Sequence, residues 1–492
     1  MRIKSARGSL LYGTLLLFIS NVLVKGLGFG YRVILVRMLG AEGMGLVEMV
    51  TPIYAFLLVL AGLGLQPALA QKVAGSGAAL AGGYFRTARR LLLLSGSVVT
   101  VGAVLLSPLL VRWFAADARV GPALLALLPA VLIVSLASAR RGWFHGRREL
   151  GSLGMSQNVE QAARVVLGVW LVRRLRPAGL ARAAAGVSLA TVGGELAGYL
   201  YLVLRGGLRR PQRLRKRTGA EREQARQLLA YGLPMTGGRL VNSVLLMLQA
   251  FLIPCCLQRA GYGVTAATEI YGRFSGVALT LLHLPGVFAS ALATAVMPAA
   301  AASKTDAELL LRHVVRPLQA VLICTLPGMA LLYLYAYPLA AGLFNNAPAA
   351  PLLRLLTPGG VFLYLQTTLA GVLQGLGDVK RLLINNAVAG ILLLAGVVWL
   401  VPREDFGICG AAVAMDLSWL CGFLLHLAAV RRHLERDLPW TRVVGPPLLA
   451  FVAAVVSWAI CRSAGAGHGI AIVAAGAAYL LALLPQRRRL SL

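Results

Sequence analysis

The stretch RGGLRRPQRLRKRTGAEREQAR, residues 205–226, lies near the middle of the chain and separates two long apolar parts of the sequence. It carries nine Lys and Arg residues. Such a segment either binds anionic lipid or nucleic acid, or serves as a cytoplasmic linker that is basic for reasons of topology. The apolar sequence on both sides favours the linker. The net charge of +31 therefore does not indicate a nucleic-acid-binding protein.

The apolar segments on either side of this linker indicate a membrane protein. Of the 492 residues, 58% are hydrophobic and 13% are charged, and the mean hydropathy is +0.77. A soluble domain cannot bury so much apolar surface. Runs long enough to cross a bilayer predict an all-α membrane protein with about 14 transmembrane helices. The expected spans are 10–36, 45–71, 91–111, 120–139, 152–172, 183–204, 228–257, 268–299, 314–337, 352–375, 382–401, 408–430, 443–461 and 467–485.

Basic residues collect in every second gap between these spans. With the N-terminus placed inside, the inner segments hold 32 of the 48 Lys and Arg residues, the outer gaps hold 12, and four lie within spans. The positive-inside rule then predicts a multi-pass protein of the cytoplasmic membrane with both termini in the cytoplasm. One outer gap breaks the trend, because it contains Arg173, Arg174, Arg176 and Arg182.

The two apolar parts repeat each other at a separation of 229 residues. Nine identities fall in 37 ungapped positions, among them Gly142 with Gly371, Gly146 with Gly375, and the segment VWLV at 169–172 and 398–401. The repeat predicts two six-helix lobes, residues 1–204 and 228–430, joined by the basic linker 205–227. Residues 431–492 then add two helices and a basic tail. Parallel repeats of this kind are typical of transporters, whose substrate site lies between the lobes.

Ionisable and amide side chains at membrane depth are the candidate substrate-binding residues, because burying a charge there costs about 2.5–3.5 kcal/mol. Lys25 and Arg32 share one face of the first span. Glu160 and Arg164, spaced i,i+4, either neutralise each other in a site or only fix helix packing. The full set is Lys25, Arg32, Arg239, Asn242, Gln249, Glu160, Arg164, Glu195 and Asn386. Hydrogen bonding between helices is the alternative role of the amides.

No arrangement of residues in the sequence indicates catalysis. The six cysteines lie in or beside apolar spans, the six histidines are scattered, and no metal-binding spacing occurs. We therefore expect no enzyme, no metal and no cofactor. The glycines are dispersed through the spans, as helix packing in membranes requires.

Several motifs resemble a known family. These are VKGLGFGYRVILVRMLGAEGMGL (24–46), RRGWFHG (140–146), LAGVLQG (369–375), GLPMTGGRL (232–240) and RAGYGVTAATEIYGRFSGVA (259–278). They are similar to polysaccharide exporters, and most of all to stage V sporulation protein B-like proteins. Those proteins belong to the multidrug/oligosaccharidyl-lipid/polysaccharide (MOP) exporter superfamily. The resemblance covers nearly the whole chain.

The resemblance implies a MATE-like fold and a flippase that works by alternating access. Its substrate would be a polyprenyl-linked sugar or peptidoglycan precursor, its surroundings membrane lipids, and its driving force Na⁺, H⁺ or the membrane potential. Lys25 falls on the position of a first-helix arginine of the related lipid II flippases, and Arg32 falls within one residue of a second. A second-helix arginine of those proteins corresponds to the apolar stretch near Phe56 and Leu57.

Three alternatives stay open at this point. A multidrug or organic-cation antiporter of the same superfamily needs an unpaired carboxylate in its cleft, for which Glu195 or Asp416 would serve. A membrane enzyme acting on polyprenyl phosphates would need a cluster of acids or histidines. A non-transporting scaffold would need no polar cleft.

Overall fold

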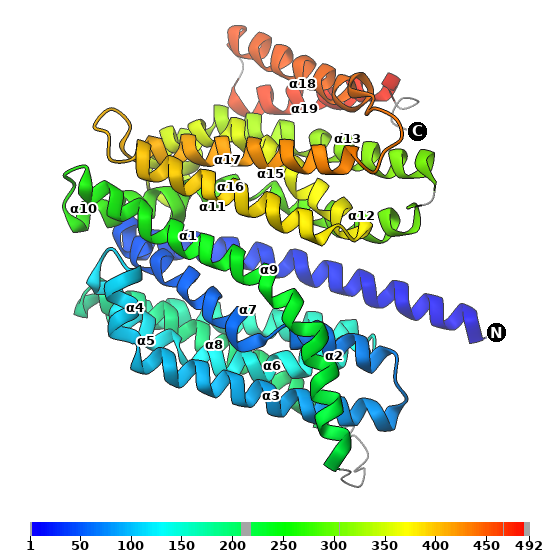
Figure 1. The fold of residues 1–492 in the computed structure, drawn as a ribbon. Helices are drawn as coiled ribbons and strands as arrows, with labels where there is room; N and C mark the ends of the chain where they lie inside the picture. The colour runs from blue at the N-terminus through cyan, green and yellow to red at the C-terminus, as the bar shows by residue number, and fades with distance from the viewer. Residues whose placement is uncertain (1, 208–217, 305, 466, 487–492) are drawn as a thin grey trace. The chain divides into compact units, whose positions relative to one another are not determined.

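The computed structural model describes residues 2–207, 218–304, 306–465 and 467–486, and every regular element within these ranges is a helix (Figure 1). By their internal contacts, the residues form two compact units. Unit 1 comprises residues 1–277 and 343–346, and unit 2 comprises residues 278–342 and 347–492. The all-α fold class predicted from the apolar periodicity is confirmed for the part of the chain that the structure describes.

Unit 1 contains the helices up to the middle of the chain. In chain order these are α1 (Arg2–Gly62), α2 (Leu65–Ala74), α3 (Ala78–Leu105), α4 (Ser107–Phe114), η1 (Ala118–Val120), α5 (Gly121–Leu127), α6 (Pro129–Gly146), α7 (Leu150–Leu175), η2 (Arg176–Ala178), α8 (Leu180–Gly207), α9 (Thr218–Arg259), α10 (Val264–Tyr271) and the π-helix η3 (Gly272–Ala278). Residues 208–217 of the basic linker lie outside the described residues.

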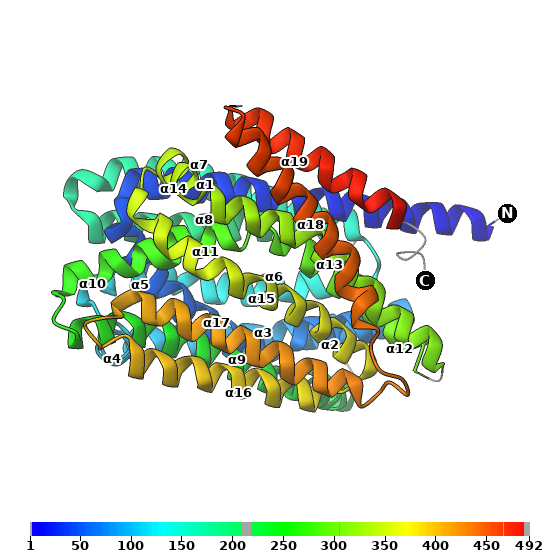
Figure 2. The same ribbon diagram turned by 90° about the horizontal axis from the view of Figure 1, so that it is seen from above.

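Unit 2 is built around α15 and α17, which pack against each other, with α16 beside α17 (Figure 2). Its elements are α11 (Leu279–Leu282), α12 (Gly286–Ala302), α13 (Ala307–Leu334), α14 (Ala336–Phe344), η4 (Ala347–Ala349), α15 (Ala350–Leu376), α16 (Val379–Leu400), α17 (Gly407–Arg431), α18 (Trp440–Ser463), α19 (His468–Leu483) and η5 (Leu484–Gln486). The last helix pair, α18 and α19, packs through α18 on α13.

Ten of the described helices are long and apolar enough to cross a membrane. A bent pair, Val264–Leu282 with Gly286–Ala302 at 58°, raises the number to eleven. The expected span 10–36 falls in α1, which breaks at Gly40 with φ 71° and ψ −179°, and the expected span 45–71 begins in α1 and runs into α2. The helix α7 lacks the apolar window because charged and amide side chains lie along its length. The figure of fourteen spans stays a prediction.

The two halves of the 229-residue repeat have the same local structure. The loop between α6 and α7 is closed by hydrogen bonds from Arg148 N to His145 O and from Glu149 N to Phe144 O. The loop between α15 and α16 is closed by Gly377 N to Gln374 O and Asp378 N to Leu373 O, at the equivalent positions. The residues Arg148 and Gly377 both adopt positive φ, 59° and 76°.

The paired glycines also have the same role in each half. Gly142 and Gly146 of α6 face the backbone carbonyls of Gln66 and Ala70 in α2, and Gly371 and Gly375 of α15 face those of Ala293 and Met297 in α12. A Cβ atom at any of the four would press on backbone atoms. Small residues four apart let helices approach closely inside a membrane. The division into two six-helix lobes, by contrast, stays a prediction.

Candidate functional site

Four ionised side chains from three helices of unit 1 meet in one cluster. Arg141 of α6 donates through Nη2 to Glu160 of α7 at 2.8 Å and to Glu195 of α8 at 3.1 Å. Arg164 of α7 donates through Nη2 to Glu160 at 2.7 Å and to Glu195 at 3.2 Å. Each arginine thus contacts both acids. We call these four residues the charge cluster.

The charge cluster is largely closed off from its surroundings. Its side chains are 10–22% exposed, with Glu195 at 10% and Arg164 at 22%. The close approach of α7 and α8 depends on Gly194 and Gly198, which lie against the backbone and Cβ of Glu160. Positive and negative charges alternate around the cluster, so its formal charge is zero. Buried ions tolerate low dielectric only when they are paired in this way.

Polar atoms without partners occur in the charge cluster itself and in α1 and α7, which pack against each other. The hydroxyls of Tyr31 and Tyr54 in α1 are buried, and neither makes a hydrogen bond to the described residues. Tyr54 lies within the electrostatic field of all four cluster residues. Four further atoms are also buried without a hydrogen-bond partner among the described residues: Gln157 Oε1, Asn158 Oδ1, Arg141 Nε and Arg164 Nε. Buried polar atoms normally find partners, so this group has unused capacity to bind a polar ligand.

The first-span cations have different environments. Lys25 is exposed. Arg32 forms an ion pair with Glu48, on the other side of the break at Gly40 in α1, and Glu48 also accepts a hydrogen bond from Ser275 Oγ at 3.0 Å. Arg32 is therefore neutralised in this conformation.

The seventh-span residues lie along α9, which packs on α1 within unit 1. Arg239 and Asn242 are exposed and Gln249 is half-buried. Among the described residues, no acid forms an ion pair with Arg239. Asn386 lies half-buried in α16, in unit 2. Of the sequence-predicted residues, the structure brings Glu160, Arg164 and Glu195 together in the charge cluster.

Arg141 is the site residue that the sequence reasoning missed. The sequence predicts a loop for Arg141, in the gap between the expected spans 120–139 and 152–172, and this placement is wrong because α6 continues to Gly146. Its side chain is only 18% exposed. A signal was available: the fifth and sixth spans hold two acids, Glu160 and Glu195, but only one arginine. A second buried acid requires a second cation.

Unit 2 contains a buried acid of another kind. The carboxylate of Asp416 in α17 lies against Gly359 of α15, and its Oδ1 atom is buried without a hydrogen bond to the described residues. Further along the same helix pair, Gln366 lies against Gly422. Its Oε1 atom is also buried without a hydrogen bond to the described residues. Asp416 therefore has the chemistry of a cation or proton site.

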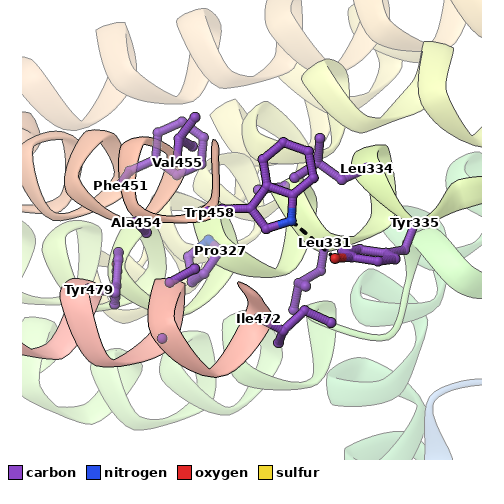
Figure 3. Close-up of a pocket in the computed structure, with 13 residues that line it drawn as sticks. Pro327, Leu331, Leu334, Tyr335, Phe451, Ala454, Val455, Trp458, Ile472 and Tyr479 are labelled. Carbon is purple, nitrogen blue, oxygen red and sulfur yellow. Dashed lines mark hydrogen bonds between the residues drawn. The ribbon is translucent and has the colours of Figure 1, made fainter. Parts of the chain in front are cut away.

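A separate pocket of about 150 Å³ lies between α13, α18 and α19 of unit 2 (Figure 3). Its lining includes Pro327, Leu331, Phe451 and Ile472, and on one side Trp458 Nε1 donates to the Tyr335 hydroxyl at 3.0 Å. This lining offers little to a phosphate or a sugar. No residue of the predicted substrate site lies there.

Among the described residues, no three His, Cys, Asp or Glu side chains are grouped to hold a metal ion. The site is instead a set of fixed charges and unpartnered polar atoms between membrane-type helices. A repeated, all-helical architecture with such a site is typical of membrane transporters.

Comparison with known proteins identifies the family. The model of the polysaccharide biosynthesis protein family matches residues 10–304, and the chain belongs to this family. Stage V sporulation protein B of Bacillus subtilis (strain 168) is 30% identical over 97% of this chain and 96% of its own length. Lipid II flippase MurJ of the same organism is 22% identical over 86% of this chain and 83% of its own length. The expected kinship with stage V sporulation protein B-like exporters is confirmed.

Solved structures show the same fold. Lipid II flippase MurJ in an inward closed conformation matches with a TM-score of 0.73 and 13% identity, over 97% of this chain and all of that one. An inward-facing multidrug resistance MATE family transporter of the MOP superfamily matches with a TM-score of 0.66 and 17% identity, over 83% of this chain and 94% of that one. The protein is therefore a multi-pass membrane protein with the MATE-like fold that the sequence predicted.

Proposed function

We propose that the protein is a flippase that moves a polyprenyl-linked sugar or peptidoglycan precursor across the cytoplasmic membrane by alternating access. Membership of the polysaccharide biosynthesis family and similarity to a lipid II flippase support this proposal. The observation that carries it is the excess of cations in the polar part of unit 1. Arg239 has no acid partner among the described residues, and Lys25 is exposed on α1. Cations suit a pyrophosphate headgroup.

Each group in the site then has a role. The pyrophosphate binds Lys25 and Arg239, and Arg32 joins them when its ion pair with Glu48 opens. Amides such as Asn242 and Gln249 bind the sugar hydroxyls. The polyprenyl chain remains in the lipid. Binding and reorientation need no bond to be made or broken, which fits a transporter.

The charge cluster serves to hold α6, α7 and α8 as one body while the substrate passes. Because the charge cluster is neutral overall, the substrate binds the cations on α1 and α9 instead. A coupling ion, Na⁺ or H⁺, is a further part of the proposal, and Asp416 is the acid best suited to bind it. The termini and the linker lie in the cytoplasm.

Purified protein in proteoliposomes provides the test. With a fluorescent polyprenyl-pyrophosphate-linked sugar, wild type should expose the label to a membrane-impermeant quencher within minutes. Lys25→Ala should abolish this transport, and Lys25→Arg should retain part of it. Arg312→Ala, at an exposed i,i+4 pair with Glu308, is the matched control and should transport normally. Normal transport by Lys25→Ala would refute the headgroup mechanism.

The organic-cation antiporter is the second candidate, and the unpartnered carboxylate oxygen of Asp416 favours it. That reading predicts efflux of a cationic dye that is lost in Asp416→Asn and unaffected in Lys25→Ala. The flippase predicts no dye efflux and loss of lipid transport in Lys25→Ala. The two variants therefore separate the two functions.

A further inference from the structure

A tryptophan followed by an arginine four residues later occurs at the same place in both repeats. The first pair is Trp170 with Arg174, near the end of α7, and the second is Trp399 with Arg403, at the end of α16. The separation is again 229 residues for both partners. Neither arginine has a role in the proposed transport site.

The second pair is stacked. The guanidinium of Arg403 lies 4.0 Å from the ring centroid of Trp399, whose side chain is 62% exposed. The acids Glu404 and Asp405 follow directly in sequence, yet neither forms an ion pair with Arg403. A guanidinium stacked on indole is held with its donors directed outward.

In the first pair, the arginine does not stack on the tryptophan. Trp170 is 55% exposed, and Arg174 is exposed without stacking on it. Among the described residues, Arg173, Arg174 and Arg182 make no ion pair, and Arg176 donates to the backbone oxygen of Met38 at 2.9 Å. The acids of this loop region, Glu42 and Asp117, are both engaged by Arg119 instead. Uncompensated positive charge thus collects around the first pair.

The helix faces that lead to each tryptophan are apolar and exposed. Val166, one turn before Trp170, is 68% exposed, and Leu392, two turns before Trp399, is 40% exposed. Such faces contact lipid chains, and a tryptophan at their end sits at the level of the lipid headgroups. An arginine one turn further along then reaches the layer of lipid phosphates, which it binds through two parallel hydrogen bonds.

We propose that each Trp–Arg pair binds the phosphate of an anionic phospholipid at the membrane surface. The charge distribution of the sequence predicts the outer surface for both helix ends. The outer arginines near the first pair, which run against the positive-inside rule, then have a ligand. Their net charge selects an anionic headgroup over a zwitterionic one. The proposal does not depend on what the protein transports.

Native mass spectrometry of the purified full chain, titrated with phosphatidylglycerol, tests this. Arg403→Gln should weaken one bound lipid about tenfold, as loss of a charged hydrogen-bonding partner does. Arg174→Gln should do the same, and the double variant should lose both lipids. Arg403→Lys should weaken binding less, because the lysine ammonium keeps the positive charge but cannot form two parallel hydrogen bonds to the phosphate. Binding of phosphatidylcholine should be weak throughout.

The control is Arg182→Gln, which removes an unpaired arginine from the same loop region without touching a tryptophan. It should leave the tight lipids bound. An equal loss in Arg182→Gln would mean diffuse attraction by net charge and would overturn the proposal, as would unchanged binding in Arg403→Gln. Elution as a single species, with unchanged melting temperature, shows that each variant is folded.

Discussion

Arg141 is bound to two carboxylates on two other helices, and this arrangement determines what its removal does. Without it, Glu160 and Glu195 would share Arg164 alone, and the cluster would carry a net negative charge in a poorly solvated place. Removing one partner of a buried ion pair is far more damaging than replacing the whole group. Arg141 thus stabilises the packing of the helices around it by neutralising their carboxylates.

Arg141→Ala should lower the free energy of unfolding by about 3–5 kcal/mol. Thermal melting of the purified protein in detergent measures this as a lower melting temperature. Arg312→Ala, in an exposed pair, should change stability by at most about 1 kcal/mol. The double variant Arg141→Met with Glu195→Gln should be more stable than Arg141→Ala, since it removes one charge of each sign. A double variant that is less stable than Arg141→Ala would contradict the pairing argument.

The sequence predicts the types of residue in the site better than their partners. The i,i+4 spacing of Glu160 and Arg164 is enough to predict their contact, because helix geometry alone brings them together. The pairs Arg141 with Glu195 and Arg32 with Glu48 depend on how separate segments pack. No periodicity in the sequence encodes such contacts.

At the scale of the helices, the glycines of the repeat determine how closely neighbours pack. Gly142 faces the carbonyl of Gln66 in α2, and its counterpart Gly371 faces that of Ala293 in α12. Backbone cannot move aside as a flexible side chain can. The repeat could be found in the sequence because this steric requirement conserves glycine in both halves.

Gly142→Leu should destabilise the protein by more than about 1–3 kcal/mol, because the new side chain meets backbone in a packed interior. The control is Gly102→Leu in α3, where nothing lies within 4 Å of an added Cβ atom. That change should be neutral or slightly stabilising, since leucine favours helix over glycine. Melting temperatures of the two variants in the same detergent compare them. An equal loss of stability in both variants would show that the close contact between α6 and α2 does not determine the effect.

For the molecule as a whole, the distribution of Lys and Arg along the chain predicts its direction in the membrane. In a variant without the six native cysteines, Asp405→Cys should react with an impermeant thiol reagent on whole cells. Arg436→Cys should stay unmodified until the cells are opened. The same holds for a probe at Arg213, which lies outside the described residues. Labelling of Arg436→Cys from outside would reverse the predicted topology.

The sequence predicts the class of the molecule well, because length, apolar content and charge distribution leave few other folds. It does not predict how the helices associate. The helices α9 and α10 pack with the N-terminal helices in unit 1, although the repeat counts them with the second half. Such contacts depend on the detailed shape of helix surfaces, and helices with the same hydrophobic pattern can differ in that shape.

The balanced charges of Arg141, Arg164, Glu160 and Glu195 have an electrical consequence. A voltage of 100 mV does about 2.3 kcal/mol of work on each elementary charge that crosses it. Two positive and two negative groups moving together carry no net charge, so the charge cluster itself adds no electrical work when α6, α7 and α8 shift in a polarised membrane. The field acts instead on isolated cations such as Arg239 and on whatever anion they carry.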